Sequence, residues 1–362
     1  MHLTVANVAH FLIGRGLLGA EAVVDGDLVV LDASRRNRNF KVVRDGGGGG
    51  LFVKQMRELQ ADAMLTLRRE AACYDLARSD PALGRLMPRL VAYDALRHVL
   101  VVEMVPEAES LAEHHLRQHS FPPALGQALG EAIGLYHARA AGVAGNEAMQ
   151  SLFARQVPVV LTLGRGGHAM LGQYGRIGPA LSAVIQQHPE FQGLLDALGE
   201  EWRFDSLIHG DMKWDNVLVF PVGSETPDFR IVDWEMADIG DAAWDVGAVL
   251  QSFLTAWILS MPIASGLPPE SYVAMAGQPI EAMRPVMHAF WRAYAGVRGF
   301  GAADGRREIE RCLRFAAARL VWSAIEQRLY APGLDPSVAA LLQVSLNILK
   351  DPGRAVRELL DA

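Results

Sequence analysis

Two neighbouring stretches of the sequence place polar side chains at the ends of apolar runs. Asp211 and Asn216 lie on a short segment between two such runs, and Asp233 follows a third run that ends at Val232. Turn-forming residues occur in the connection 221–228, so a hairpin would return Asp233 to the side of Asn216. This pattern predicts that two carboxylates and one amide carbonyl surround a common point.

A cluster of this kind suits phosphoryl transfer. Magnesium prefers oxygen ligands, and at phosphate sites it usually takes one or two carboxylates together with the phosphates. A separate carboxylate is needed to orient the attacking hydroxyl and to accept its proton. The spacing Asp-x-x-x-x-Asn from Asp211 to Asn216 is that of the protein-kinase catalytic loop, and Asp233 occupies the place of the metal-binding aspartate.

The residues around these positions differ from those of protein kinases. His-Gly-Asp at 209–211 replaces His-Arg-Asp, and Asp-Trp-Glu at 233–235 replaces Asp-Phe-Gly. With these changes the sequence resembles the aminoglycoside phosphotransferase and choline kinase family of small-molecule kinases. A Gly-Asp-x-x-Trp-Asp run that ends at Asp245 extends the resemblance.

The resemblance implies an α+β, two-lobed protein-kinase-like fold. A small N-terminal nucleotide-binding lobe, 1–103, would contain a five-stranded antiparallel sheet, and a larger, mainly helical lobe, 104–362, would carry the catalytic loop and the acceptor site. Apolar patterns and turn signals predict strands at 22–31, 40–43, 51–54, 90–93 and 99–105. They predict helices at 4–15, with Thr4 as N-cap, and at 58–77, 123–141, 179–188, 190–202, 280–297, 306–330 and 337–350.

The resemblance also implies a role for each residue of the motif. Asp211 would be the catalytic base or align the acceptor hydroxyl, while Asn216 and Asp233 would bind magnesium that bridges the nucleotide phosphates. Lys213 would be a second catalytic residue that neutralises charge on the transferred phosphoryl group, and the alternative is a solvent-exposed lysine. Glu235 is a weaker candidate for a further metal ligand.

Other residues near the motif are expected to support it. His209 would orient the loop by hydrogen bonding, and Asp245 would brace the loop from below. His137 is interpreted as a structural residue of the larger lobe. Trp214 and Trp234 are expected to pack, with the acceptor site as an alternative place for Trp234.

In the smaller lobe, the predicted third strand ends in a lysine that would bind the nucleotide. Lys54 would reach the α- and β-phosphates and pair with a glutamate of the following helix. Glu70 is the preferred partner, and Glu58 is its rival. Backbone groups near Glu103 and Val105 resemble the hinge of the family and would pair with adenine.

Two connections of the smaller lobe could contact phosphates. The first, 32–39, has no G-x-G-x-x-G, but its backbone N–H groups and Ser34 could hold a phosphate; the alternative is an exposed basic turn. The second, 46–50, consists of five glycines. Because no Gly-Lys-Ser/Thr and no helix follow it, a flexible hairpin tip is favoured over a phosphate loop.

Composition limits the class of protein. A chain of 362 residues is long enough for two lobes, and a net charge of -7 argues against a general nucleic-acid-binding surface. Cys73 and Cys312 are the two cysteines, and their separation fits core residues in a reducing cytoplasm. The N-terminus lacks the basic region of a signal peptide. The apolar run 246–264 contains several polar residues, which favours a buried helix over a membrane span.

The acceptor is the part of the reaction that the motifs describe least. Only nine residues separate Glu235 from Asp245, which leaves no room for the activation segment that protein kinases use as a peptide platform. The expected activity is therefore transfer from ATP or GTP, with Mg²⁺, to the hydroxyl of an aminoglycoside-, choline- or sugar-like molecule. The alternatives are a kinase of Ser or Thr in a biosynthetic precursor peptide and a non-catalytic nucleotide-binding module. No nucleic-acid or membrane partner is expected.

Overall fold

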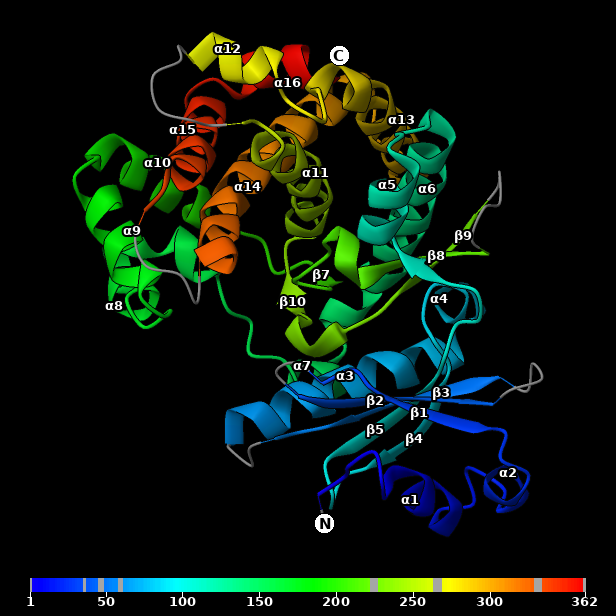
Figure 1. The fold of residues 1–362 in the computed structure, drawn as a ribbon. Helices are drawn as coiled ribbons and strands as arrows, with labels where there is room; N and C mark the ends of the chain where they lie inside the picture. Colours follow the sequence, from blue (N-terminus) through cyan, green and yellow to red (C-terminus); the bar gives the residue numbers. More distant parts are fainter. Residues whose placement is uncertain are drawn as a thin grey trace. The chain divides into compact units, whose positions relative to one another are not determined.

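The structure is a computed structural model that describes residues 2–34, 37–44, 49–57, 61–221, 227–262, 269–328 and 334–360. Its chain forms two compact units, and Figure 1 labels their elements. The first unit contains residues 1–114, 151–153 and 215–237, and the second contains 115–150, 154–214 and 238–362. The segment 215–237, predicted in the C-terminal lobe, is thus grouped with the N-terminal residues. The predicted lobe boundary at residue 103 stays a prediction.

A five-stranded antiparallel sheet forms the centre of the first unit. Its strands are β1 (Leu28–Asp32), β2 (Arg38–Arg44), β3 (Gly50–Gln55), β4 (Leu90–Asp94) and β5 (Val99–Glu103), in the order β1-β2-β3-β5-β4. The predicted sheet is confirmed. The predicted first strand, 22–31, was partly wrong, because Glu21–Val24 forms the short helix α2. Gly26, with φ of +75°, then turns the chain before β1 begins.

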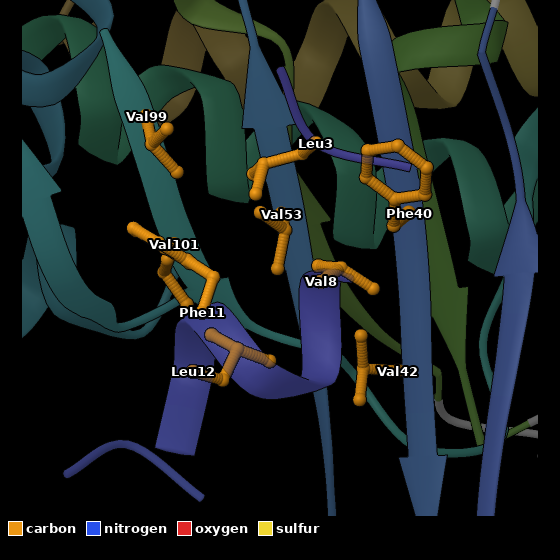
Figure 2. Close-up of a cluster of buried hydrophobic side chains, with 9 residues drawn as sticks. All are labelled: Leu3, Val8, Phe11, Leu12, Phe40, Val42, Val53, Val99 and Val101. Atoms are coloured by element: carbon orange, nitrogen blue, oxygen red, sulfur yellow. The ribbon is translucent and has the colours of Figure 1, made fainter. Parts of the chain in front are cut away.

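Helix α1 (Val8–Gly14) packs on one face of this sheet (Figure 2). The buried cluster consists of Leu3, Val8, Phe11, Leu12, Phe40, Val42, Val53, Val99 and Val101. Alternation along each strand places the strand residues of this set on one face. The prediction of Thr4 as N-cap was wrong. The Thr4 carbonyl accepts hydrogen bonds from Asn7 and Val8 in a turn that precedes the helix, and Asn7 occupies the N-cap position.

The opposite face of the sheet carries Lys54. Strand alternation points this side chain away from Val53 and toward helix α3 (Ala61–Ser79), which is followed by the short α4 (Pro81–Gly84). On the outer strand β1, Val29 and Leu31 are 39% and 51% exposed. Val30 packs toward α1, so Val29 and Leu31 lie on the Lys54 face. The predicted start of α3 at residue 58 lies outside the described residues.

A smaller sheet of the first unit holds the second part of the motif. It consists of β6 (Glu109–Ser110), β8 (Val217–Phe220) and β9 (Asp228–Ile231), in that order. Val217 pairs with Ile231, and the N–H of Val232 donates to the Asn216 carbonyl at 2.9 Å. The predicted hairpin is therefore confirmed, although its tip, 222–226, lies outside the described residues. The sequence analysis missed β6, because two residues carry no periodic signal.

The second unit is mainly helical (Figure 1). Its helices are α6 (Pro123–Ala140), α7 (Glu147–Gln150), α8 (Gly167–Leu171), α9 (Ile177–Gln186), α10 (Pro189–Glu200), α11 (Ala242–Leu259), α12 (Pro269–Ala274), α13 (Ile280–Arg298), α14 (Ala302–Arg328), α15 (Pro336–Lys350) and α16 (Pro352–Leu360). Helix α5 (Leu111–Gln118) begins in the first unit's stretch of sequence and ends in the second's. Strands β7 (Ser206–Ile208) and β10 (Asp238–Gly240) pair antiparallel. Helix α16 was not predicted, although Pro352 suits its first position.

Helix α11 belongs to the core of the second unit. Among the described residues it alone is long and apolar enough to cross a membrane, but 72% of it is buried inside the protein. The prediction of a buried helix is confirmed. It begins at Ala242, four residues earlier than predicted, because the Asp241 side chain caps it by accepting the Ala243 N–H. Cys73 and Cys312 are both buried and free.

Glycines allow α6 and α13 to approach closely. Gly126, Gly130 and Gly134 recur every fourth residue of α6, and a Cβ on Gly130 would lie 2.2 Å from the carbonyl oxygen of Phe290. We expect Gly130→Ala to destabilise the protein by about 1–3 kcal/mol, because a backbone oxygen of a packed helix cannot move aside. Urea unfolding measures this cost. Gly142→Ala is the control, since no atom lies within 4 Å of its added Cβ; equal unfolding midpoints for the two variants would contradict the prediction.

Candidate active site

Lys54 lies at the centre of an acidic cluster in the first unit. It is only 4% exposed, and its Nζ lies 2.8 Å from Glu70 Oε2, 2.6 Å from Asp233 Oδ1 and 3.0 Å from Glu235 Oε2. Strand β3 supplies the lysine, helix α3 supplies Glu70, and the segment after β9 supplies the other two carboxylates. The predicted partnership of Lys54 with Glu70 is present. Its rival, Glu58, lies outside the described residues.

Burial and charge set the protonation of this cluster. Burial alone would lower the pKa of Lys54, but the three carboxylates outweigh it and hold the pKa well above its ordinary value. For Glu70, burial raises the pKa to about 7 against the lowering effect of Lys54. The lysine is therefore charged throughout the physiological range, and it needs its anionic neighbours because an unpaired buried ammonium is costly.

The same carboxylates form a candidate metal site. One oxygen each of Glu70, Asp233 and Glu235 lies within 4.8 Å of the others. With all three ionised, they and Lys54 carry a formal charge of -2, which one divalent cation would balance. The donors are hard oxygens that suit magnesium. Asn216, the second predicted ligand, is 7% exposed and precedes the strand that pairs with β9. Its assignment to the metal, with that of Asp233, stays a prediction.

Asp233 has an unusual backbone conformation. Its φ of 65° and ψ of 57° are left-handed, which costs a non-glycine residue about 1–2 kcal/mol. The conformation turns the chain from β9 into the 3₁₀ helix η5 (Trp234–Met236) and leaves the carboxylate 45% exposed. Such strain is retained where the surrounding structure requires it, often at functional sites.

Glu235 is more involved than the sequence indicated. Besides Lys54, its Oε2 accepts a hydrogen bond from Asn37 Nδ2 at 3.1 Å. Asn37 is 5% exposed and lies in the connection between β1 and β2 that was predicted to contact phosphates. Glu235 therefore joins this connection to the lysine. No local sequence signal identified Asn37, because its partner is 198 residues away.

The other predicted nucleotide residues lie in the first unit as well. Ser34 Oγ accepts the Asn39 N–H at 3.1 Å, so this hydroxyl helps to close the connection between β1 and β2. Glu103 ends β5, and its N–H donates to the Arg89 carbonyl at 2.9 Å. A nucleobase contact at Glu103 would therefore use its carbonyl oxygen. Val105 follows two residues later and is half-buried. All three nucleotide roles stay predictions.

In the second unit, a buried network holds the loop that carries Asp211. Asp245 accepts the N–H groups of His209 at 2.7 Å and Gly210 at 2.9 Å, as the predicted bracing requires. His137 Nε2 lies 3.3 Å from Asp245 Oδ2, and its Nδ1 lies 3.0 Å from the Tyr294 hydroxyl. Burial lowers the pKa of His137 below its ordinary value, which favours the neutral form and agrees with the structural role that was predicted.

Asp211 is held between two cations. Its Oδ1 lies 3.0 Å from Arg319 Nη2, and its Oδ2 lies 3.0 Å from Lys213 Nζ. The Asp211 N–H donates to His209 Nδ1 at 3.2 Å, so His209 orients the loop as predicted. Burial alone would raise the pKa of Asp211, but Arg319, Lys213 and His209 together hold it below its ordinary value. The carboxylate is thus ionised and oriented.

Two residues of α14 in this site were missed by the sequence analysis. Arg319 binds Asp211 from 108 residues away, and Glu326 accepts a hydrogen bond from Lys213 at 2.8 Å from 113 residues away. Their helical periodicity predicted a helix but not which side chains would face the loop. Lys213 is 26% exposed, so it is neither fully solvated nor buried. Its catalytic role stays a prediction.

The tryptophans of the motif pack. Trp214 makes an edge-to-face contact with Phe253 at 4.7 Å between ring centroids, and Trp234 is fully buried with its Nε1 donating to the Ile231 carbonyl. Asp211 belongs to the second unit, while Asn216 and Asp233 belong to the first. The convergence of the three side chains on one ion stays a prediction.

Comparison with known proteins finds a matching protein family and several similar solved structures. The model of the phosphotransferase enzyme family (APH) matches residues 27–290, which is more than half of the chain. A search of curated proteins finds no match. Among solved structures, an ethanolamine kinase of Plasmodium vivax is similar over 96% of this chain and 86% of its own, with 10% identity and a TM-score of 0.55.

Two further structures show the same likeness. A choline kinase of Cryptosporidium parvum is similar over 96% of both chains, with 10% identity and a TM-score of 0.54. An APH(2") enzyme in complex with GDP and kanamycin is similar over 95% of this chain and 99% of its own, with 13% identity and a TM-score of 0.52. These likenesses confirm the predicted protein-kinase-like fold. The family match confirms the predicted enzyme class, and the chain therefore belongs to the phosphotransferase enzyme family.

Proposed function

We propose that this protein transfers the γ-phosphoryl group of ATP or GTP to a hydroxyl of a small molecule. The observation that carries the proposal is Lys54, which is buried and paired with Glu70, Asp233 and Glu235 at 2.6–3.0 Å. If a metal ion neutralised Asp233 and Glu235, the ammonium group of Lys54 could turn from these carboxylates to the nucleotide phosphates.

The sheet face around Lys54 suits a nucleobase. Val29 and Leu31 leave apolar surface uncovered on this face, and Val43 and Phe52 are half-buried beside them in the strand register. A flat heteroaromatic ring would cover such a surface and remove it from water. Backbone groups of Glu103 and Val105 would contact the ring edge, and Ser34 with its neighbouring amides would contact a phosphate.

Asn216 and Asp233 would hold a magnesium ion in this proposal. Their amide and carboxylate oxygens are ligands that magnesium accepts, and the acidic cluster fits a divalent cation by charge. A bound magnesium ion supplies neutralisation of the β- and γ-phosphates. Asp211 would accept a hydrogen bond from the acceptor hydroxyl, and Lys213 would offset charge on the transferred group.

Several observations favour a small acceptor molecule, and the cysteines favour a cytoplasmic location for the protein. The segment between Glu235 and Asp245 contains η5, β10 and the cap of α11, and no peptide platform occurs in it. The similar structures include an ethanolamine kinase, a choline kinase and an enzyme bound to kanamycin, so amino alcohols and aminoglycosides are the first acceptors to test. Buried, free Cys73 and Cys312 fit a reducing compartment.

A screen of ATP and GTP consumption with Mg²⁺ tests the function. Acceptors should include aminoglycosides, amino alcohols, sugars, nucleosides and precursor peptides. We expect one class of small hydroxyl compound to raise consumption above the slow hydrolysis seen without an acceptor. Stimulation by a precursor peptide alone would replace the small acceptor with a Ser or Thr side chain. Nucleotide binding without turnover under any condition would favour a non-catalytic binding module and overturn the proposal.

A further inference from the structure

The two oxygens of Asp211 have partners of different character. Arg319 holds Oδ1, and Lys213 holds Oδ2, each at 3.0 Å. The arginine comes from helix α14, whereas the lysine comes from the same loop as Asp211. The carboxylate therefore has one oxygen fixed by a distant element and one oxygen paired with a neighbour.

Several contacts hold the buried side chain of Arg319 in place. Its side chain is 4% exposed, and its Nη1 donates to the Gly210 carbonyl at 3.1 Å. Its Nε lies 3.4 Å from Gln251 Oε1, and its guanidinium lies 4.9 Å from the ring centroid of Trp244. Trp244 Nε1 donates to the same Gly210 carbonyl at 3.0 Å. Because a buried guanidinium that loses its partners is costly, this group stays in place.

Lys213 has an alternative partner. Its Nζ lies 2.8 Å from Glu326 Oε1, and the two side chains are 26% and 40% exposed. Such a solvent-accessible ion pair is weak and can rearrange. The ammonium can therefore leave Asp211 Oδ2 and keep Glu326, whereas Arg319 cannot leave Oδ1 without becoming a buried, uncompensated charge.

We propose that Arg319 is a positioning residue for phosphoryl transfer, which fixes Asp211 through Oδ1 and so orients the carboxylate that receives the acceptor proton. This inference rests on the proposed function. In the step itself, the acceptor oxygen forms a bond to the γ-phosphorus, and the bond from that phosphorus to the bridging oxygen of the nucleotide breaks. The nucleoside diphosphate leaves with the electron pair, and the acceptor proton passes to the Asp211 carboxylate.

Arginine substitutions on α14 test the inference. We expect Arg319→Gln to lower the kcat of Mg-ATP hydrolysis by on the order of 10²-fold, since misplacing a reacting group by about 1 Å can cost that much. The KM for Mg-ATP should stay within a few-fold of wild type. Arg319→Lys keeps a charge with one donor group and should recover a substantial part of the loss. Arg314→Gln is the matched control, because Arg314 lies on the same helix and pairs with the half-exposed Glu201; it should leave kcat unchanged.

A crystal structure of Arg319→Lys supplies the second readout, which is independent of turnover and covers the case in which Arg319→Gln fails to fold. We expect Asp211 to keep its position in Arg319→Lys and to rotate away in Arg319→Gln wherever that variant folds. Wild-type kcat in folded Arg319→Gln, or an Arg319→Lys protein no more active than Arg319→Gln, would overturn the inference while the proposed function stands. If wild type itself turns over no ATP, the proposed function fails. In that case the structure still tests the positioning role, which an unmoved Asp211 in Arg319→Gln would overturn.

Discussion

Replacing Asp211 with asparagine is expected to lower kcat by on the order of 10²–10⁴-fold while nucleotide binding is retained. Asparagine has nearly the same shape, and its side-chain carbonyl can still accept the hydrogen bond that Arg319 donates to Oδ1 at 3.0 Å. It carries no charge, so it cannot take the acceptor proton, and both Arg319 and Lys213 lose an anionic partner at 3.0 Å. The measurement is kcat with ATP, Mg²⁺ and the best acceptor of the screen, together with a nucleotide titration.

The matched control is Asp215→Asn. Asp215 is exposed and lies four residues beyond Asp211 on the same segment, and no chemistry is assigned to it. Turnover of this variant should equal that of wild type, which separates the loss of one particular carboxylate from a general change of charge near the loop. An Asp211→Asn enzyme within a few-fold of wild type would exclude Asp211 from the reaction.

Replacing Asp233 with alanine is expected to remove the magnesium-dependent part of the stabilisation by ATP. For wild type, a nucleotide concentration 100-fold above Kd should stabilise the protein by about 2.7 kcal/mol, and the share that needs Mg²⁺ should vanish in the variant. Turnover should fall by on the order of 10²–10³-fold, the size seen when one electrostatic group at a transition state is removed. The variant should fold, because Lys54 retains Glu70 at 2.8 Å and Glu235 at 3.0 Å.

Thermal melting with ATP plus Mg²⁺ and with ATP plus a chelator separates the two contributions. Asp228→Ala is the control, since Asp228 is exposed at the start of β9 and has no assigned ligand role. It should melt like wild type under both conditions. If the magnesium-dependent shift persists in Asp233→Ala, the metal is bound elsewhere, and Glu70 and Glu235 become the next residues to replace.

Local patterns were enough to predict much of the first unit. The strands around Lys54 and the hairpin that ends at Asp233 depend on alternation of side chains and on nearby turn residues, and both signals act over a few residues. Errors arose where a short signal was ambiguous. Residues 21–24 are as apolar as a strand start but form a helical turn, and Thr4 is a good N-cap type that lies one turn too early.

The residues that were missed depend on partners far away in the sequence. Asn37 reaches Glu235 across 198 positions, and Arg319 reaches Asp211 across 108. The sequence alone does not distinguish the buried Arg319 from the other arginines of α14. The energy that favours its burial comes from a partner that is distant in the sequence. Neither burial nor partnership can be read from periodicity alone.

The amino-acid sequence by itself determined the type of chemistry, since the spacing of Asp211, Asn216 and Asp233 and the strand that ends in Lys54 depend only on nearby residues. The tertiary structure decided which charges surround these groups: three carboxylates around Lys54, and Arg319 and Lys213 around Asp211. The physical reason is that electrostatic interactions act through space between elements that packing brings together, whereas propensity and spacing act along the chain.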